Sequence, residues 1–169
     1  AILMVVTNVD LGRVVLFQGS EEQRGHVSRR AERHSFEVEA TADAAALPKL
    51  LKSPEHSVLL LGEYTSAARE VLRALREQKP WKRLAAFTVV PDEQIDARLL
   101  KQANELRLEI LPASMPEQRV WQKLRQAHET CRAGGRWSVQ NRRAHFRLPL
   151  QAKATLMMEA ETVDISEGG

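Results

Sequence analysis

Three arginines lie within six positions near the carboxyl end of the chain. Arg142, Arg143 and Arg147 all fall in the stretch NRRAHFRLPL. A guanidinium group is a planar fork of donors that pairs with two phosphate oxygens or with N7 and O6 of guanine, and its flat face stacks on a base. Arg143 and Arg147 are four positions apart, so on an extended or irregular segment they can hold opposite sides of one compact ligand. We interpret the run as ligand-binding, the alternative being a solvated basic linker.

A second polar motif begins seventeen positions after Arg147. In DISEGG, the residues Asp164, Ser166 and Gly169 form the pattern D-x-S-x-x-G. An aspartate carboxylate accepts from N1 and N2 of guanine, a serine hydroxyl adds a contact, and glycine permits a close approach of the backbone. The residues between the motifs, LPLQAKATLMMEAETV, predict a strand, a break and a second strand. Together the two motifs indicate a site for a guanine nucleotide.

The order and spacing of these motifs, RxxxR and then DxSxxG, resemble the signature of the PilZ domain family. The resemblance implies a six-stranded β-barrel that binds the bacterial second messenger cyclic di-GMP. It implies that Arg143 and Arg147 hold phosphate and guanine, and that Asp164 and Ser166 bind guanine. The ligand-binding residues that we expect are Arg142, Arg143, Arg147, Asp164, Ser166 and Gly169. A binding module of this kind implies no catalytic residue, no cofactor and no enzyme activity.

The chain before these motifs alternates strand-like apolar runs with helical patterns. The expected strands are 14–17, 36–41, 57–62, 84–90 and 106–111, and Ser20 with Gln23 predicts a capping box between the first two. Parallel neighbours need long crossovers, so this alternation predicts an α/β fold with a doubly wound, five-stranded parallel sheet over residues 13–132. We expect 133–141 to be a linker and 142–169 to be the amino-terminal part of a PilZ barrel. Residues 1–12 predict an N-terminal extension, either an edge strand or a swapped arm.

The stretch VVLFQGSEEQRGHVSRRAERHSFEV, residues 14–38, resembles the first β-α-β unit of a response-regulator receiver domain. That family uses an acidic pair to hold Mg²⁺, an aspartate to accept a phosphoryl group and a lysine before a proline, and the first two roles need carboxylates. Here the corresponding residues carry no carboxylate and no lysine: Gln18 and Gly19, then Leu61 or Gly62, then Leu111. Thr88 alone matches, and we interpret it as a β-favouring residue. We therefore expect a receiver-like domain that is not phosphorylated and that binds a protein partner or a second copy of itself.

Several single side chains that precede both motifs favour structural roles. In the helix around Ala68 and Leu72, the arginines Arg69, Arg73 and Arg76 are expected on the solvent face. Trp81 is expected to cap the same helix from outside, and Trp137 to cover an interface. Cys131 is expected at a helix end, with nothing nearby that would depress its thiol pKa.

Composition excludes several other classes of protein. The chain has 25 Lys and Arg against 22 Asp and Glu, a net charge of only +3, and no helix-turn-helix pattern, so DNA is not an expected partner. The single cysteine forbids an intramolecular disulfide, and the histidines lack metal-ligand spacing. Apolar runs are far shorter than the roughly 20 residues of a membrane span. The expected function is that of a cytoplasmic bacterial signalling adaptor that binds cyclic di-GMP, and the alternative is an interaction scaffold whose PilZ segment binds no nucleotide.

Overall fold

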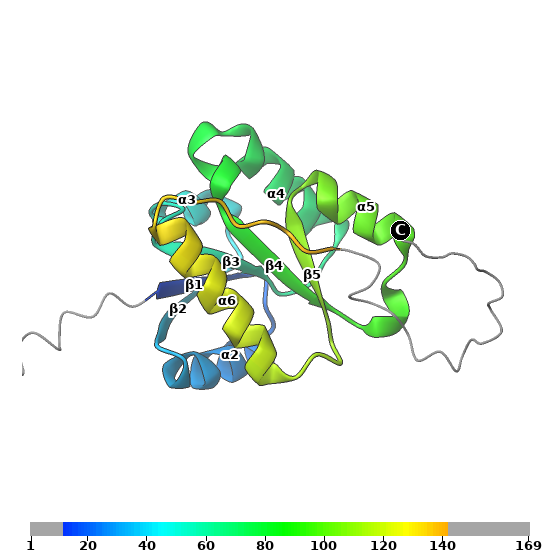
Figure 1. Cartoon of the computed structure of the whole chain (residues 1–169), viewed down its shortest axis with the longest axis horizontal. Coiled ribbons are helices and arrows are strands. Elements are labelled where there is room, and N and C mark those ends of the chain that lie inside the picture. Colours follow the sequence, from blue (N-terminus) through cyan, green and yellow to red (C-terminus); the bar gives the residue numbers. More distant parts are fainter. Residues whose placement is uncertain (1–11, 142–169) are drawn as a thin grey trace, which may run out of the picture.

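The computed structural model describes residues 12–141, which fold around one parallel sheet (Figure 1). The strands lie in the order β2-β1-β3-β4-β5, and every neighbouring pair is parallel. The chain therefore starts inside the sheet and crosses over in both directions, which is the doubly wound topology that the alternation predicted. The strands are β1 (Gly12–Phe17), β2 (Phe36–Thr41), β3 (Ser57–Leu61), β4 (Ala85–Val90) and β5 (Leu108–Pro112).

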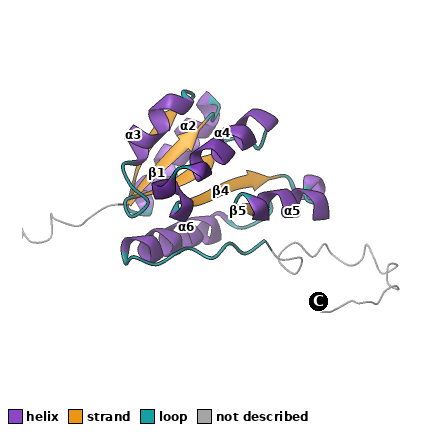
Figure 2. Ribbon diagram, turned by 90° about the horizontal axis from the view of Figure 1, so that it is seen from above, coloured by secondary structure: helices purple, strands orange, loops and turns teal. Residues whose placement is uncertain are grey.

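Helices cover both faces of this sheet. Apolar side chains of α2 and α6 belong to one core cluster with Leu16, Leu60 and Phe87, whereas α3, α4 and α5 contribute to a second cluster on the other face. Figure 2 shows α6 and the loop after it on one side of the sheet, with α3 and α4 on the other. The helices are α2 (Glu21–Arg33), α3 (Leu47–Leu51), α4 (Ser66–Glu77), α5 (Ala97–Glu105) and α6 (Glu117–Arg132).

Local capping signals begin three of these helices. Ser20 accepts from the Gln23 backbone N–H while the Gln23 side chain accepts from the Ser20 N–H, so the predicted capping box is formed. Thr65 caps α4 and Asp96 caps α5, each through one side-chain oxygen that accepts from a backbone N–H of the helix. Each cap satisfies a backbone N–H that has no partner within its helix, worth about 1 kcal/mol. The caps therefore determine where the chain turns from the sheet into a helix.

Two side chains near the end of α4 are buried, although the sequence predicted them on the surface. Arg76 is only 8% exposed, and Trp81 packs in the core cluster that α4 helps to form. Arg76 lies four residues after Leu72 and so shares its buried face. Its guanidinium bonds four carbonyl oxygens, those of Trp81, Leu84, Leu106 and Arg107. The prediction was wrong because these acceptors come from loops that periodicity within one helix does not reveal.

Candidate functional site

The carboxyl ends of the parallel strands meet at one edge of the sheet, where α/β folds commonly bind ligands. Gly62, directly after β3, lies against the β1–α2 loop. A Cβ atom at this position would lie 2.5 Å from Cα of Gly19 and 2.7 Å from the carbonyl oxygen of Gln18. The Gly62 N–H donates to Phe17 O at 2.9 Å, and its carbonyl accepts from Gln23 Nε2 at 2.8 Å. Backbone thus occupies the space that a side chain at Gly62 would need, and Leu61, the other candidate acceptor position, is buried in the core.

The two residues that replace the acidic pair have structural roles. Gln18 has φ of 59°, in the left-handed region, and its N–H donates to Thr41 O at 2.9 Å. A Cβ atom on Gly19 would lie 2.6 Å from Cδ2 of Leu16. Neither residue supplies a carboxylate, and the loop they form closes on Gly62. The two positions at this end of β1 therefore lack the carboxylates that hold Mg²⁺ in the receiver-domain pattern.

Thr88 and Leu111 complete the same edge. Thr88 is fully buried, and its hydroxyl donates to Leu61 O at 3.0 Å, which joins β4 to β3. The interpretation of Thr88 as a strand residue agrees with this contact. Leu111 is also fully buried, within the cluster shared by α2 and α6. At this position the receiver-domain pattern has a lysine, whereas here Leu111 packs in the apolar core.

One carboxylate at this edge holds two loops together. Asp92, after β4, accepts from the Ser114 backbone N–H at 2.9 Å and from the Ser114 hydroxyl. The hydroxyl contact is the main cause that lowers the pKa of Asp92 below its usual value, with partial burial acting in the opposite direction. Asp92 therefore links the loop after β4 to the loop after β5. Among residues 12–141, no group of three His, Cys, Asp or Glu side chains could hold a metal ion.

A buried polar network lies at a different place, beside β5. Glu109, the second residue of β5, is 1% exposed, and Lys123 on α6 is 4% exposed. Lys123 Nζ lies 2.7 Å from Glu109 Oε2 and donates to Gln140 Oε1 at 2.6 Å. The other oxygen, Glu109 Oε1, accepts from Trp137 Nε1 at 2.9 Å and from the Gln140 N–H at 3.3 Å. Every oxygen of this buried carboxylate therefore has a donor, as burial of a charge requires.

Asn141 extends this network to the backbone of β5. Its Oδ1 accepts from the Ile110 N–H at 2.8 Å, and its Nδ2 donates to Leu108 O at 2.5 Å. β5 is the terminal strand of the sheet, so these two groups face no other strand. The next outward position is Pro112, which has no N–H to offer. The carboxamide of Asn141 thus takes the place of a neighbouring strand.

Residues 137–141, which we call the strap, run back across the sheet after α6 to reach β5 (Figure 1). Trp137 is half-buried, its ring centroid is 6.1 Å from that of Phe87, and it packs on the cluster formed with α6. Cys131 is buried nearby. Burial raises the pKa of its thiol, and a hydrogen bond from the Trp137 backbone opposes that rise. Trp137, which the sequence analysis expected to cover an interface, therefore covers part of the domain's own core.

The sequence did not predict the buried pair or the role of Asn141, although signals for the pair existed. Glu109 is followed by two apolar residues in the strand-like segment LRLEIL, and Lys123 lies four residues before buried Ala127 on the same helical face. Two opposite charges on buried faces indicate an ion pair. The predicted ligand residues lie outside the described residues: Arg142, Arg143, Arg147, Asp164, Ser166 and Gly169. The described chain ends at Asn141, directly before the first of them.

The strand order and the helices on both faces define the class of fold: the chain has an α/β fold of the receiver or flavodoxin-like type. A similar solved structure is that of the chemotaxis response regulator CheY4 of Vibrio cholerae. The two share 18% sequence identity with a TM-score of 0.54, over 69% of this chain and 97% of that chain. No protein-family model matches the chain, and neither does any curated protein sequence. The resemblance of residues 142–169 to the PilZ family thus stays a prediction.

Within residues 12–141, no helix combines the length and the apolar character needed to cross a bilayer.

Proposed function

We propose that this chain is a signalling adaptor in which a receiver-like domain without phosphorylation chemistry carries a segment that binds cyclic di-GMP. The RxxxR and DxSxxG motifs support the ligand, since guanidinium and carboxylate groups match the phosphates and the guanine edges. The observation that carries the adaptor role is the closed edge at Gly62, where Gly19 would lie 2.5 Å from any Cβ. A receiver fold of this kind has neither a phosphoryl acceptor nor the space for its side chain. We infer that it acts by binding a protein through its surface.

The nucleotide is tested by calorimetry on the full-length protein with cyclic di-GMP. We expect saturable heat in the wild type and its loss in the double variant Arg143→Ala/Arg147→Ala. The matched control is Arg24→Ala/Arg29→Ala, which removes the same charge from exposed positions of α2. Equal loss in both double variants would assign the binding to net charge, and no heat in the wild type would exclude the ligand.

A second candidate function is an interaction scaffold that binds no nucleotide. The closed edge at Gly62 favours it equally, because that edge leaves only protein contact to the receiver-like domain. Gel filtration of the full-length protein with and without cyclic di-GMP separates the two. A ligand-dependent change of oligomeric state favours the adaptor, whereas one constant assembly without bound ligand favours the scaffold.

Phosphorylation is tested directly with acetyl phosphate and Mg²⁺. We expect no incorporation of phosphate, because the carboxyl edge offers neither an acceptor carboxylate at Gly62 nor an acidic pair at Gln18 and Gly19. Stoichiometric, acid-stable but hydroxylamine-sensitive labelling would contradict the proposed adaptor role. The same proposal places the protein in the cytoplasm, where nucleotide second messengers are formed.

A further inference from the structure

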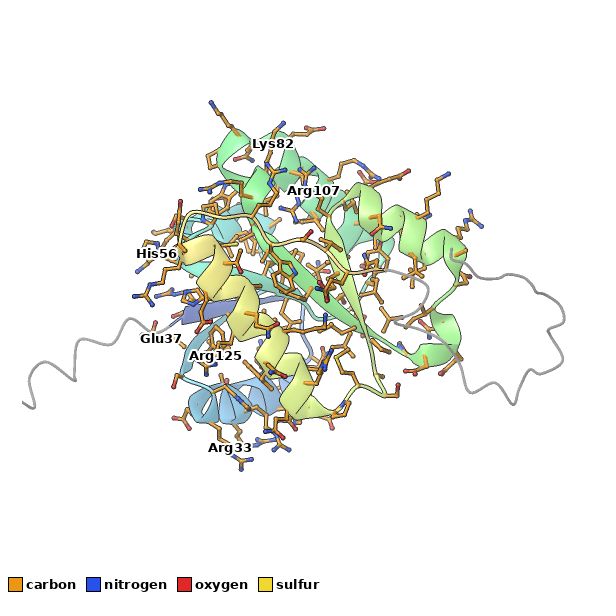
Figure 3. The ribbon with its side chains drawn as sticks, viewed as in Figure 1. Arg33, Glu37, His56, Lys82, Arg107 and Arg125 are labelled. Atoms are coloured by element: carbon orange, nitrogen blue, oxygen red, sulfur yellow. The ribbon has the colours of Figure 1, made fainter. Side chains whose placement is uncertain are left out.

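A group of basic side chains lies at the end of the sheet opposite the closed carboxyl edge. The short 3-10 helix η2 (Lys79–Arg83) leads into β4, and Arg107 directly precedes β5, so both lie at the amino ends of parallel strands. The turn after α6 reaches the same end, because Arg83 Nη1 donates to Gly134 O at 3.3 Å. Figure 3 shows Lys82 and Arg107 at one end of the molecule. We define the basic face by its four cations, which are Lys79, Lys82, Arg107 and Arg136.

These four cations are not neutralised by the described part of the chain. Three of them are exposed, and Arg107 is partly exposed. None of the ion pairs within residues 12–141 includes any of the four. In the same range, the buried Nε of Arg107 has no hydrogen-bond partner. Arg83 differs, because it pairs with Glu55 at 2.7 Å. The basic face therefore presents positive charge to solvent.

Buried Arg76 holds two segments of this face in place. Its guanidinium donates to carbonyl oxygens around η2 and to two more in the turn before β5. These bonds fix the two segments relative to each other, so little ordering is needed when the face binds a partner. Burial lowers the pKa of Arg76, and positive charge from Arg107 and Arg136 lowers it further. A negatively charged partner would offset this repulsion.

We propose that the basic face is the surface through which the receiver-like domain binds an acidic segment of its protein partner. Carboxylates of Asp and Glu match its cations, and complementary charge orients a partner and speeds its association. The cations come from three separate segments, so they match a run of carboxylates better than one small anion. This inference rests on the proposed binding of a protein and names the chemistry of that partner.

Nucleic acid fits this face less well than an acidic protein segment does. Single strands stack their bases on aromatic side chains, whereas Trp81, the aromatic residue of η2, is only 5% exposed and packs in the core. Two exposed acids, Glu77 and Glu105, lie two residues before two of the cations. A continuous phosphate backbone would be repelled by both, while a protein can place neutral or basic side chains beside them.

The experiment measures binding of a fluorescein-labelled octapeptide of alternating Glu and Ser to the full-length protein by anisotropy. We expect saturable binding at low salt, and Lys82→Ala/Arg107→Ala should weaken it about tenfold, as expected for the loss of two ion pairs. The matched control Arg98→Ala/Lys101→Ala removes the same charge from exposed positions of α5 and should change the affinity less than about twofold. In NMR spectra of wild type, the Nε–H signal of Arg107 should shift as peptide is added.

Three results would overturn the proposal. Equal weakening by the two double variants would assign the binding to net charge alone. Tighter binding of an oligonucleotide of equal charge would make nucleic acid the partner, and equally tight binding of inorganic phosphate would make the face a site for a single anion. If Lys82→Ala/Arg107→Ala unfolds at a lower temperature than wild type, Lys79→Ala/Arg136→Ala gives the same test at exposed positions.

Calorimetry with cyclic di-GMP on the same proteins separates this inference from the proposed nucleotide site. Nucleotide binding without peptide binding would overturn the role of the basic face and leave the nucleotide site standing. Peptide binding without nucleotide binding would support the basic face and favour the scaffold over the adaptor.

Discussion

Among single residues, Arg76 shows how a charge is accommodated inside this domain. Its guanidinium donates to four carbonyl oxygens, and no carboxylate among residues 12–141 forms an ion pair with it. Burial, followed by repulsion from Arg107 and Arg136, lowers the pKa of Arg76 to about 10. The group is still protonated at neutral pH. In Figure 3, Arg107 lies at the same end of the molecule as Lys82, so this region gathers positive charge.

Replacement of Arg76 by alanine should destabilise the domain strongly. The change leaves four carbonyls without their donor, so we expect a loss of about 3 kcal/mol or more in the free energy of unfolding. Arg73→Ala is the control on the same helix, because Arg73 is exposed and forms an ion pair with Glu70. That variant should cost less than about 0.5 kcal/mol. Urea denaturation of both variants measures the difference, and equal losses would refute the structural role of Arg76.

Gly62 and Gly25 should respond in opposite directions to the same substitution. At Gly62, the added Cβ meets backbone of Gly19 and Gln18, so Gly62→Ala should cost about 1–3 kcal/mol. At Gly25, inside α2, the nearest atom is the mobile Nη1 of Arg29 at 3.3 Å. Gly25→Ala should therefore gain about 0.5–1 kcal/mol from helix propensity. Thermal unfolding gives both signs, and a neutral Gly62→Ala would show that the carboxyl edge is open.

Asp92 should make stability depend on pH in acid. Its pKa in the folded state is lowered, so the folded state binds the proton less well than the unfolded chain, whose value is near 3.8. The stabilisation is present above that value and is lost as pH falls through the folded pKa. Asp92→Asn should lower stability at neutral pH by less than about 1 kcal/mol, since the group is partly exposed.

The measurement for Asp92 is urea denaturation between pH 7 and pH 2. The difference between wild type and Asp92→Asn should shrink below about pH 4 and vanish in stronger acid. Glu93→Gln serves as the control, because Glu93 is exposed on the same turn. A difference between wild type and Asp92→Asn that is constant with pH would mean that the carboxylate charge has no part in the loop contact.

At the scale of elements, the strap is the segment that a sequence-based division treats as a linker but that packing joins to β5 and α6. Trp137 packs on Phe87 and donates to Glu109. Gln140 accepts from Lys123, and Asn141 bonds the free edge of β5. None of these contacts follows from a helical or strand period within the strap. They depend on β5 and α6, which precede it in the chain.

The strap should protect Cys131 from thiol reagents. The thiol is buried, its pKa is raised by burial, and the Trp137 backbone makes a hydrogen bond to it. We expect labelling of native protein to be about a hundredfold or more slower than labelling in denaturant, because an opening that costs about 2.8 kcal/mol gives that ratio. A time course with a chromogenic disulfide at several pH values measures the rate. Fast labelling of the native protein would show that the strap does not cover this face.

For the whole molecule, the local patterns predicted the architecture well. The capping box at Ser20, the buried run in β3 and the alternation of elements all have local causes, and the sheet order agrees with them. Strand and helix periods are set by backbone geometry, which neighbouring residues largely determine. The class of fold and the absence of receiver carboxylates were accordingly visible in the amino-acid sequence.

Only the tertiary structure decided which charged and polar side chains are buried and which groups they bind. Arg76 is buried because carbonyls both near it in the chain and 30 or 31 residues away accept its hydrogen bonds. Glu109 is buried because Lys123 and Trp137 donate to it. The cost of burying a charge depends on which partners arrive, and these partners are set by crossovers that bring distant segments together. The sequence by itself therefore determined the elements, their order and the motif beyond Asn141. The fold decided that the carboxyl edge is closed and that the strap is bound to β5.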